Sequence, residues 1–177
     1  MSDITEERLN IQNEEMAYKS ALSESTFTRL GSAVNFINKR QFDTKIFEIN
    51  GPFKTATAID GAFIVPFDIE IIGVGAFNIV NGSSGTTTFN VRRFTASNVD
   101  VGSIFSTKPA ISSAAGNNAY VAKRLAPTDF ALENPAGTTL PVISVVNINA
   151  GDMLLCDIDS VQTSAQNCGL VIWFRPR

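Results

Sequence analysis

The sequence predicts a mainly β protein, an antiparallel jelly-roll β-sandwich preceded by an N-terminal α-helical segment. Two observations separate these regions. Residues 1–50 hold 14 of the 31 charged side chains. Residues 41–177 contain 14 Ile and 12 Val but only 6 Leu, and this excess of β-branched residues favours strands. We therefore divide the chain into a helical anchor or oligomerisation segment, residues 1–42, and a sandwich domain, residues 43–177.

Apolar residues at heptad spacing mark the N-terminal segment. The expected seam consists of Leu9, Met16, Phe27, Leu30, Val34 and Ile37. From Phe27 to Ile37 the spacings are three, four and three, as in a coiled coil. Upstream the repeat includes the polar Asn13 and Ser20, which weakens it. Three interpretations stay open: a helix packed on its own domain, a short parallel bundle that joins subunits, and an arm that folds on a partner.

Short apolar runs separated by Gly, Asn, Ser and Pro predict nine or ten strands in the second region. We expect strands at residues 45–49, 58–67, 69–80, 86–94, 101–106, 119–123, 141–148, 153–158 and 170–174. Gly73 and Gly75 predict a bulge or a close approach inside the third of these. Residues 81–85 predict a hairpin loop, and a second hairpin is expected near residue 162. No helical pattern of ten or more residues interrupts the strands, which disfavours parallel βαβ topology.

Two cysteines flank the second expected hairpin. Cys156 and Cys168 lie twelve residues apart, and symmetric pairing would bring them close enough for a disulfide. We interpret them as a reduced, buried thiol pair on neighbouring strands, with a disulfide formed in an oxidising medium as the alternative. Asp157 and Asp159 share one face of a strand, so a calcium site is conceivable, but a solvated pair explains them more simply.

Composition argues against several classes of function. The chain has no histidine, so it lacks the commonest general base and the commonest zinc ligand. Its net charge of -3 argues against nucleic-acid binding. The start MSDITEERLN has no secretory-signal pattern, and no apolar run is long enough to cross a membrane, so we expect production in a cytoplasm without membrane insertion. We expect no enzymatic activity, no metal and no cofactor.

The aromatic residues are mostly phenylalanine. Phe supplies 13 of the 16 aromatic side chains, with 2 Tyr and 1 Trp. Phe has no polar group and suits sandwich cores and dry subunit interfaces. Sugar-binding sites favour Trp and Tyr, and Trp173 and Tyr120 by themselves would make a poor sugar platform.

Several segments resemble one family of proteins. GPFKTATAIDGAFIVPFDIEIIGVGAFNIV at residues 51–80, the following NGSSGTTTFNV, and SIFSTKPAISSAAGNNAYV resemble the jelly-roll part of accessory virion proteins of tailed bacteriophages. VNINAGDMLLCDI, NCGLVIWFRPR and GSAVNFIN extend the resemblance to roughly residues 30–177. The turn at residues 150–152 also resembles trimeric jelly rolls of the C1q and tumour-necrosis-factor type.

The resemblance implies a structural virion protein without catalytic residues. Such a protein would be a homotrimer that decorates the capsid or forms a head fibre, made in the host bacterial cytoplasm and bound to the major capsid protein or other virion subunits. A sandwich with 17 charges in residues 51–177 fits buried contacts between subunits. The alternative is a tail or collar fibre whose loops at residues 81–85 and 112–118 bind a host-surface glycan.

Overall fold

The structure, a computed structural model, describes residues 42–124 and 135–177, which belong to one compact unit, Phe42–Arg177. The predicted helical segment lies outside the described residues except for Phe42. Its seam residues Leu9, Met16, Phe27, Leu30, Val34 and Ile37 also lie outside them, so that part remains a prediction. Within the described ranges no helix is long and apolar enough to span a membrane.

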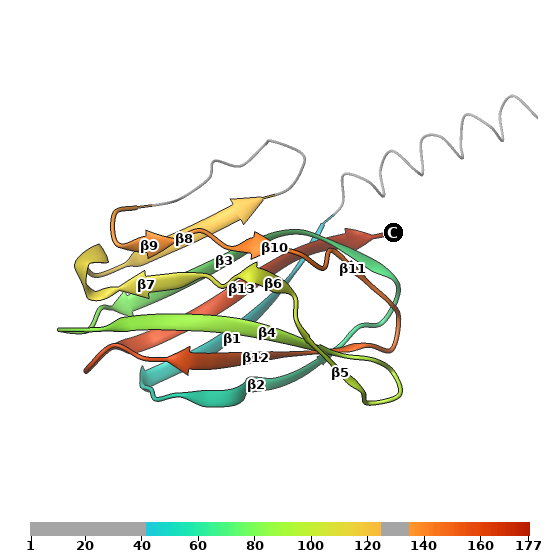
Figure 1. Cartoon of the computed structure of the whole chain (residues 1–177), viewed down its shortest axis with the longest axis horizontal. Helices are drawn as coiled ribbons and strands as arrows, with labels where there is room; N and C mark the ends of the chain where they lie inside the picture. The colour runs from blue at the N-terminus through green and yellow to red at the C-terminus, as the bar shows by residue number, and fades with distance from the viewer. Residues whose placement is uncertain (1–41, 125–134) are drawn as a thin grey trace, which may run out of the picture. The chain divides into compact units, whose positions relative to one another are not determined.

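The described part of the chain is built from antiparallel strands (Figure 1). In order they are β1 (Asp43–Pro52), β2 (Ala56–Ile64), β3 (Ile69–Val80), β4 (Thr86–Phe94), β5 (Asp100–Ser103), β6 (Phe105–Thr107), β7 (Ala110–Ser112), β8 (Ala119–Arg124), β9 (Thr138–Thr139), β10 (Val142–Ile143), β11 (Asn147–Ile148), β12 (Met153–Ser160) and β13 (Gln166–Pro176). One 3₁₀ turn, Ser113–Ala115, lies between β7 and β8.

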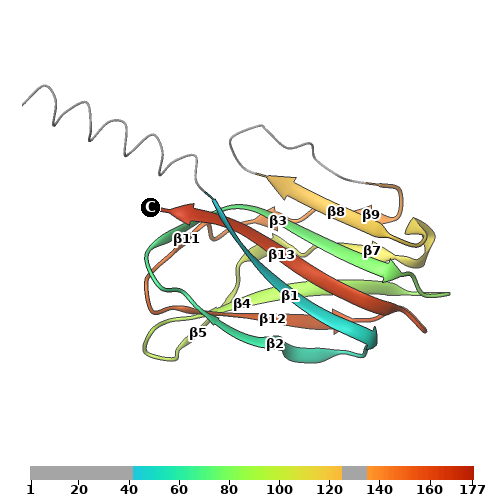
Figure 2. The same cartoon turned by 180° about the vertical axis from the view of Figure 1, so that it is seen from behind.

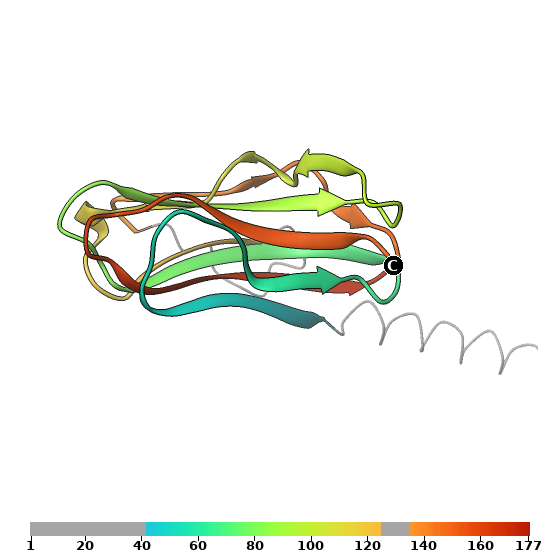
Figure 3. The same ribbon diagram turned by 90° about the horizontal axis from the view of Figure 1, so that it is seen from below.

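These strands form two large sheets that lie in two layers (Figure 3). The first, which we call sheet A, has the order β1-β13-β3-β11, and β8 also pairs with β3. The second, sheet B, has the order β2-β12-β4-β7-β9, and β5 also pairs with β4. Strands β6 and β10 form a small separate ribbon.

The hydrophobic core lies between the two sheets because every second residue of the long strands points inward. Four inward residues of sheet A and four of sheet B are at most 2% exposed: Phe47, Val74, Leu170 and Ile172, and Phe89, Val91, Leu154 and Ile158. All of them belong to one cluster of buried side chains. The predicted mainly β class with antiparallel sheets is confirmed.

The two predicted hairpins are wrong. Strand β3 pairs with β13, β8 and β11, whereas β4 pairs with β12, β5 and β7, so the loop between β3 and β4 connects opposite sheets. The same holds for β12 and β13, which lie in sheet B and sheet A respectively. A turn sequence rich in Gly and Ser suits a tight return within one sheet and a crossing between two sheets equally well, because both need the same backbone conformations.

The predicted strand positions agree with the structure where the apolar pattern is long. The limits 69–80 and 86–94 match β3 and β4. The expected strand 101–106 is instead divided between β5 and β6, and 141–148 is divided between β10 and β11. The short strands β7 and β9 were not predicted, because two or three residues carry too little pattern to be recognised.

Candidate interaction surface

The outward face of sheet A carries apolar and aromatic side chains. In β13, Val171 and Trp173 alternate with the buried residues and therefore point away from the core. Val171 lies opposite Ile46 of β1 and Gly75 of β3. Figure 2 shows these strands and β8 side by side. We call this surface the aromatic face and define it by Phe42, Ile46, Phe77, Tyr120, Val171 and Trp173.

Glycines in the sheet leave the space that these aromatic rings occupy. A Cβ atom at Gly73 would lie 3.0 Å from Cε3 of Trp173, and one at Gly75 would lie 3.0 Å from Cη2 of the same indole. At Gly75 the Tyr120 ring is equally near, with Cε2 and the hydroxyl oxygen 2.9 Å away. The indole and the phenol therefore lie against the bare backbone of β3. The predicted close approach at Gly73 and Gly75 is confirmed, and the register between β3 and β13 shifts beside Gly73.

A third ring uses a glycine in the same way. A Cβ atom at Gly169 of β13 would lie 2.6 Å from Cζ of Phe77 and 2.6 Å from the carbonyl oxygen of Phe47. The ring of Phe77 thus covers β13 as Trp173 covers β3. The rings of Trp173, Tyr120 and Phe77 can therefore lie against the sheet, because the glycines beneath them have no side chains.

Arg124 contributes a cation to the aromatic face. Its guanidinium carbon lies 4.7 Å from the centroid of the Trp173 ring and 5.3 Å from the centroid of the Phe42 ring. These distances are those of cation–π contacts. One face of the Trp173 indole ring is therefore already covered by the Arg124 side chain.

The outward face of sheet B is more strongly charged. Asp157 of β12 pairs with Arg92 of β4, which also reaches Asp100 at 3.0 Å. The hydrogen bond from Arg92 to Asp157 raises the pKa of the guanidinium. Asp159 pairs with Lys108 at 2.6 Å. The two aspartates proposed as a calcium pair thus each have a cationic partner, and within residues 42–124 and 135–177 no group of three possible metal ligands is found.

Asp152 connects the loops at one end of the sandwich. Its carboxylate accepts hydrogen bonds from Arg93 at 2.8 Å and from the backbone N–H groups of Ala96 and Asn149, each at 3.2 Å. Its side chain is 4% exposed and that of Arg93 is 19% exposed. The residue joins the loop after β4 to the loop before β12, so its role here is structural.

Cys156 and Cys168 are both free thiols and both fully buried. Cys156 lies on β12 and Cys168 on β13, so they belong to different sheets and not to neighbouring strands as predicted. Burial raises the pKa of Cys168 to about 12 and raises that of Cys156 well above its usual value. Both thiols are therefore protonated and poorly nucleophilic near neutral pH.

The two loops proposed as glycan contacts lie together at one end of the sandwich. The side-chain amide of Asn81 donates to the carbonyl oxygens of Ser112 and Ser113 at 2.9 and 3.1 Å, and its backbone N–H donates to Asn117. Beneath them, the amide nitrogen of the buried Gln162 donates to the carbonyl oxygen of Ile111 at 2.6 Å. Nearby, Oδ1 of the fully buried Asn78 has no hydrogen-bond partner among the described residues.

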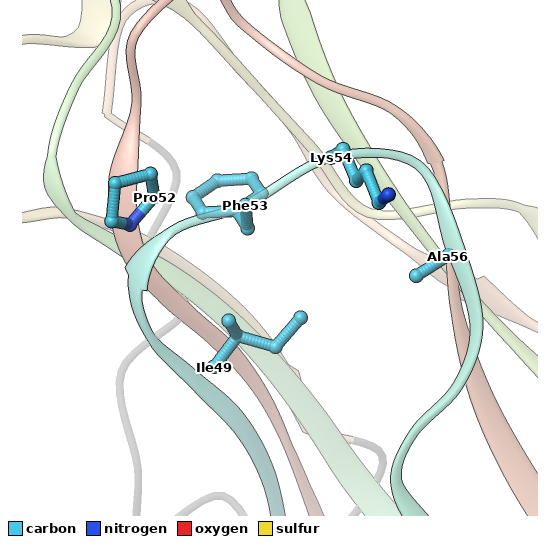
Figure 4. Close-up of a pocket in the computed structure, with 5 residues that line it drawn as sticks. All are labelled: Ile49, Pro52, Phe53, Lys54 and Ala56. Carbon is cyan, nitrogen blue, oxygen red and sulfur yellow. The ribbon is translucent and has the colours of Figure 1, made fainter.

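A shallow apolar recess lies at the turn between β1 and β2. Figure 4 shows the residues that line it, Ile49, Pro52, Phe53, Lys54 and Ala56. Its volume is about 420 Å³ and it is open to solvent. Apart from Lys54 the side chains that line it have no polar group, so these residues supply no pair of polar groups for catalysis.

The sequence did not identify the aromatic face. In the sequence Trp173 and Tyr120 stand as an isolated pair, whereas the structure places Phe77 and Arg124 on the same sheet and Phe42 against Arg124. One signal was present: the spacing of Gly73 and Gly75 leaves one side of a strand without side chains, and large residues of neighbouring strands then cover that side.

Comparisons with known proteins give no family. No family model and no curated protein matches this chain. Among solved structures, the SPBc2 prophage-derived protein YomS is 15% identical with a TM-score of 0.32, over 75% of this chain and 95% of that chain.

Two further solved structures are similarly distant. A CocE/NonD family hydrolase from Staphylococcus aureus is 8% identical with a TM-score of 0.35, over 77% of this chain and 31% of that chain. A chain of infectious bursal disease virus, Gt strain, is 8% identical with a TM-score of 0.29, over 77% of this chain and 33% of that chain. This chain thus spans about a third of each of these two. Likenesses at this level carry no argument about function.

Proposed function

We propose that this chain is a structural virion protein: a homotrimeric capsid decoration or head-fibre protein of a bacteriophage particle, without catalytic activity. The observation that carries the proposal is the aromatic face, an outward sheet surface of the kind that subunit contacts use. The resemblance of residues 30–177 to accessory virion proteins supports it.

The strand order supports the jelly-roll part of the proposal. The four-stranded sets β1-β13-β3-β8 and β2-β12-β4-β7 make eight strands in two facing sheets. Eight antiparallel strands in two sheets are the arrangement of a jelly roll. Jelly rolls are common in capsid and lectin domains, so the architecture agrees with a virion role without requiring it.

In this proposal the two predicted regions have separate tasks. The segment 1–42 attaches or trimerises the protein through Leu9, Met16, Phe27, Leu30, Val34 and Ile37. The sandwich projects outward or contacts neighbouring capsid subunits. Many copies on one particle would make modest single contacts effective together.

Particle composition tests the proposal. Particles produced from the genome that encodes this chain are purified, and the chain is quantified by mass spectrometry against the major capsid protein. We expect a fixed ratio between the two, and we expect that Leu30→Asp together with Val34→Asp lowers the amount attached. A chain that is abundant in the lysate and absent from the particles would overturn the proposal.

A second candidate is a tail or collar fibre that binds a host-surface glycan. The observation that favours it is the meeting of the loops at residues 81–85 and 112–118, where Ser83, Ser84 and Asn117 are exposed. Binding of the full chain to a panel of bacterial surface glycans tests it. Binding that Asn117→Ala abolishes, with an unchanged fold, would favour this candidate over a purely structural role.

A further inference from the structure

The aromatic face has fewer paired surface charges than the outward face of sheet B. On sheet B, Arg92 and Lys108 are paired with acidic side chains that point outward. On sheet A, the guanidinium of Arg124 at the end of β8 is stacked on Trp173 and Phe42. Near the end of β13, Glu70 and Arg175 neutralise each other at 2.7 Å. The face therefore presents mainly rings and aliphatic side chains, together with the exposed carboxylate of Glu48, which lies two residues from Ile46 on β1.

Two of the side chains of the aromatic face are strongly exposed in the single chain. Ile46 of β1 and Phe42, the residue before that strand, are each 46% exposed, although large apolar side chains are usually covered. Exposing them costs free energy, because about 25 cal/mol is gained for each Å² of apolar surface removed from water. A partner that covered this face would recover that free energy.

The size and chemistry of the face favour a protein over a sugar. Four strands at about 4.8 Å spacing and the seven consecutive paired residues of β1, 43–49, at about 3.3 Å give a flat area of about 440 Å². That is roughly half of the ~800 Å² that each partner contributes to a standard interface. The flat area leaves out the additional surface of the protruding side chains. A sugar would need accessible ring faces and hydrogen-bonding groups. Arg124 already lies over the Trp173 ring, and the side chains near Trp173 include the aliphatic Ile46 and Val171.

The residue types are those of a subunit contact. Trp, Tyr and Arg are enriched among residues that dominate binding energy, and they cluster at the centre of interfaces. Trp173, Tyr120 and Arg124 meet around Gly73 and Gly75. Contacts around a symmetry axis bring the same surface of two copies together. This surface carries an exposed carboxylate, Glu48, and the guanidinium of Arg124, so opposite charges of two copies can face each other.

We propose that the aromatic face of sheet A is the surface through which copies of this chain pack against one another. This inference rests on the proposed homotrimer, because it names the partner of that surface as a second copy. It differs from the assembly through residues 1–42 alone, since it places a main contact in the sandwich.

The test introduces a carboxylate on the aromatic face, at Ile46 of the edge strand β1. Ile46→Asp is compared with Ile64→Asp, a matched control on β2 of sheet B, where Ile64 is 65% exposed. The subunit concentration at half dissociation of the full-length chain is measured by analytical ultracentrifugation. We expect Ile46→Asp to raise it by about 30-fold or more, as when an unpaired charge is buried in an interface, and Ile64→Asp to leave it within about threefold. An equal effect of the two substitutions would overturn the inference.

A second readout reports on the face itself. Trp173 is the single tryptophan of the chain. We expect iodide to quench its fluorescence weakly in the oligomer and strongly after dilution to monomers. Quenching that is the same in both states would overturn the inference even if residues 1–42 hold the oligomer together. A wild-type chain that stays monomeric at all concentrations would also overturn it, whereas the proposed virion role is read separately from particle composition.

Discussion

The buried ion pair between Asp152 and Arg93 is expected to be a main stabilising contact at one end of the sandwich. In Asp152→Asn the Oδ1 atom can still accept from the backbone, but Arg93 loses its counter-charge. The Asp152 side chain is 4% exposed and the Arg93 side chain 19% exposed, so water replaces the lost partner poorly. Removing one partner of a buried pair costs about 3–5 kcal/mol, and because Arg93 keeps some contact with water we expect about 3 kcal/mol.

A matched substitution separates burial from charge. Asp159 forms an ion pair of the same kind with Lys108, but both side chains are more than a third exposed, at 37% and 38%. Exposed pairs contribute about 0.2–1 kcal/mol, so Asp159→Asn should cost less than about 1 kcal/mol. Both variants are unfolded in urea at one subunit concentration, with Trp173 fluorescence as the signal. We expect Asp152→Asn to be the less stable variant. The reasoning would be refuted if the unfolding free energies of the two variants differed by less than about 1 kcal/mol.

Three further predictions concern single sites. Gly169→Ala should lower the unfolding free energy by about 1–3 kcal/mol, because its Cβ would lie 2.6 Å from the Phe47 carbonyl oxygen; a wild-type value in the same urea titration would contradict this. Cys156 and Cys168 should not react with a disulfide reagent at neutral pH until the chain unfolds, since burial raises the pKa of both thiols; rapid labelling of the native protein would contradict this. The backbone hydrogen bond from Ala150, followed by the hydrogen bond from Arg177, lowers the pKa of Asp68, so its contribution to stability is present above its ordinary pKa near 3.8 and is lost as the pH falls through the lowered value. Asp68→Asn should therefore be less stable than wild type at neutral pH and equal to it in strong acid, and a difference that persists in acid would contradict this.

The sequence predicted those features of the fold that depend on local pattern. The limits of β3 and β4 follow from their apolar pattern and from the flanking turn residues, which are local. Which strands pair is not local. The strands β12 and β13 were expected to pair with each other, yet each pairs with strands distant in sequence. A residue buried between two sheets has the same hydrophobicity whichever sheet carries its strand, so the pattern cannot distinguish a hairpin from a crossing.

The same limit explains why the candidate surface emerged only from the structure. Phe42 and Trp173 are 131 positions apart in the chain, and Arg124 contacts both because β1, β13, β3 and β8 adopt one register in sheet A. Counting tryptophan and tyrosine along the sequence measures how many rings exist but not how many share a face. The two glycines of β3 carried the missing information, because a strand that lacks side chains at alternate positions requires neighbours large enough to cover it. When the glycines lie on the outward face of a sandwich, the rings that cover them stay accessible to solvent. Such rings are suited to a contact with another molecule and do not extend the core.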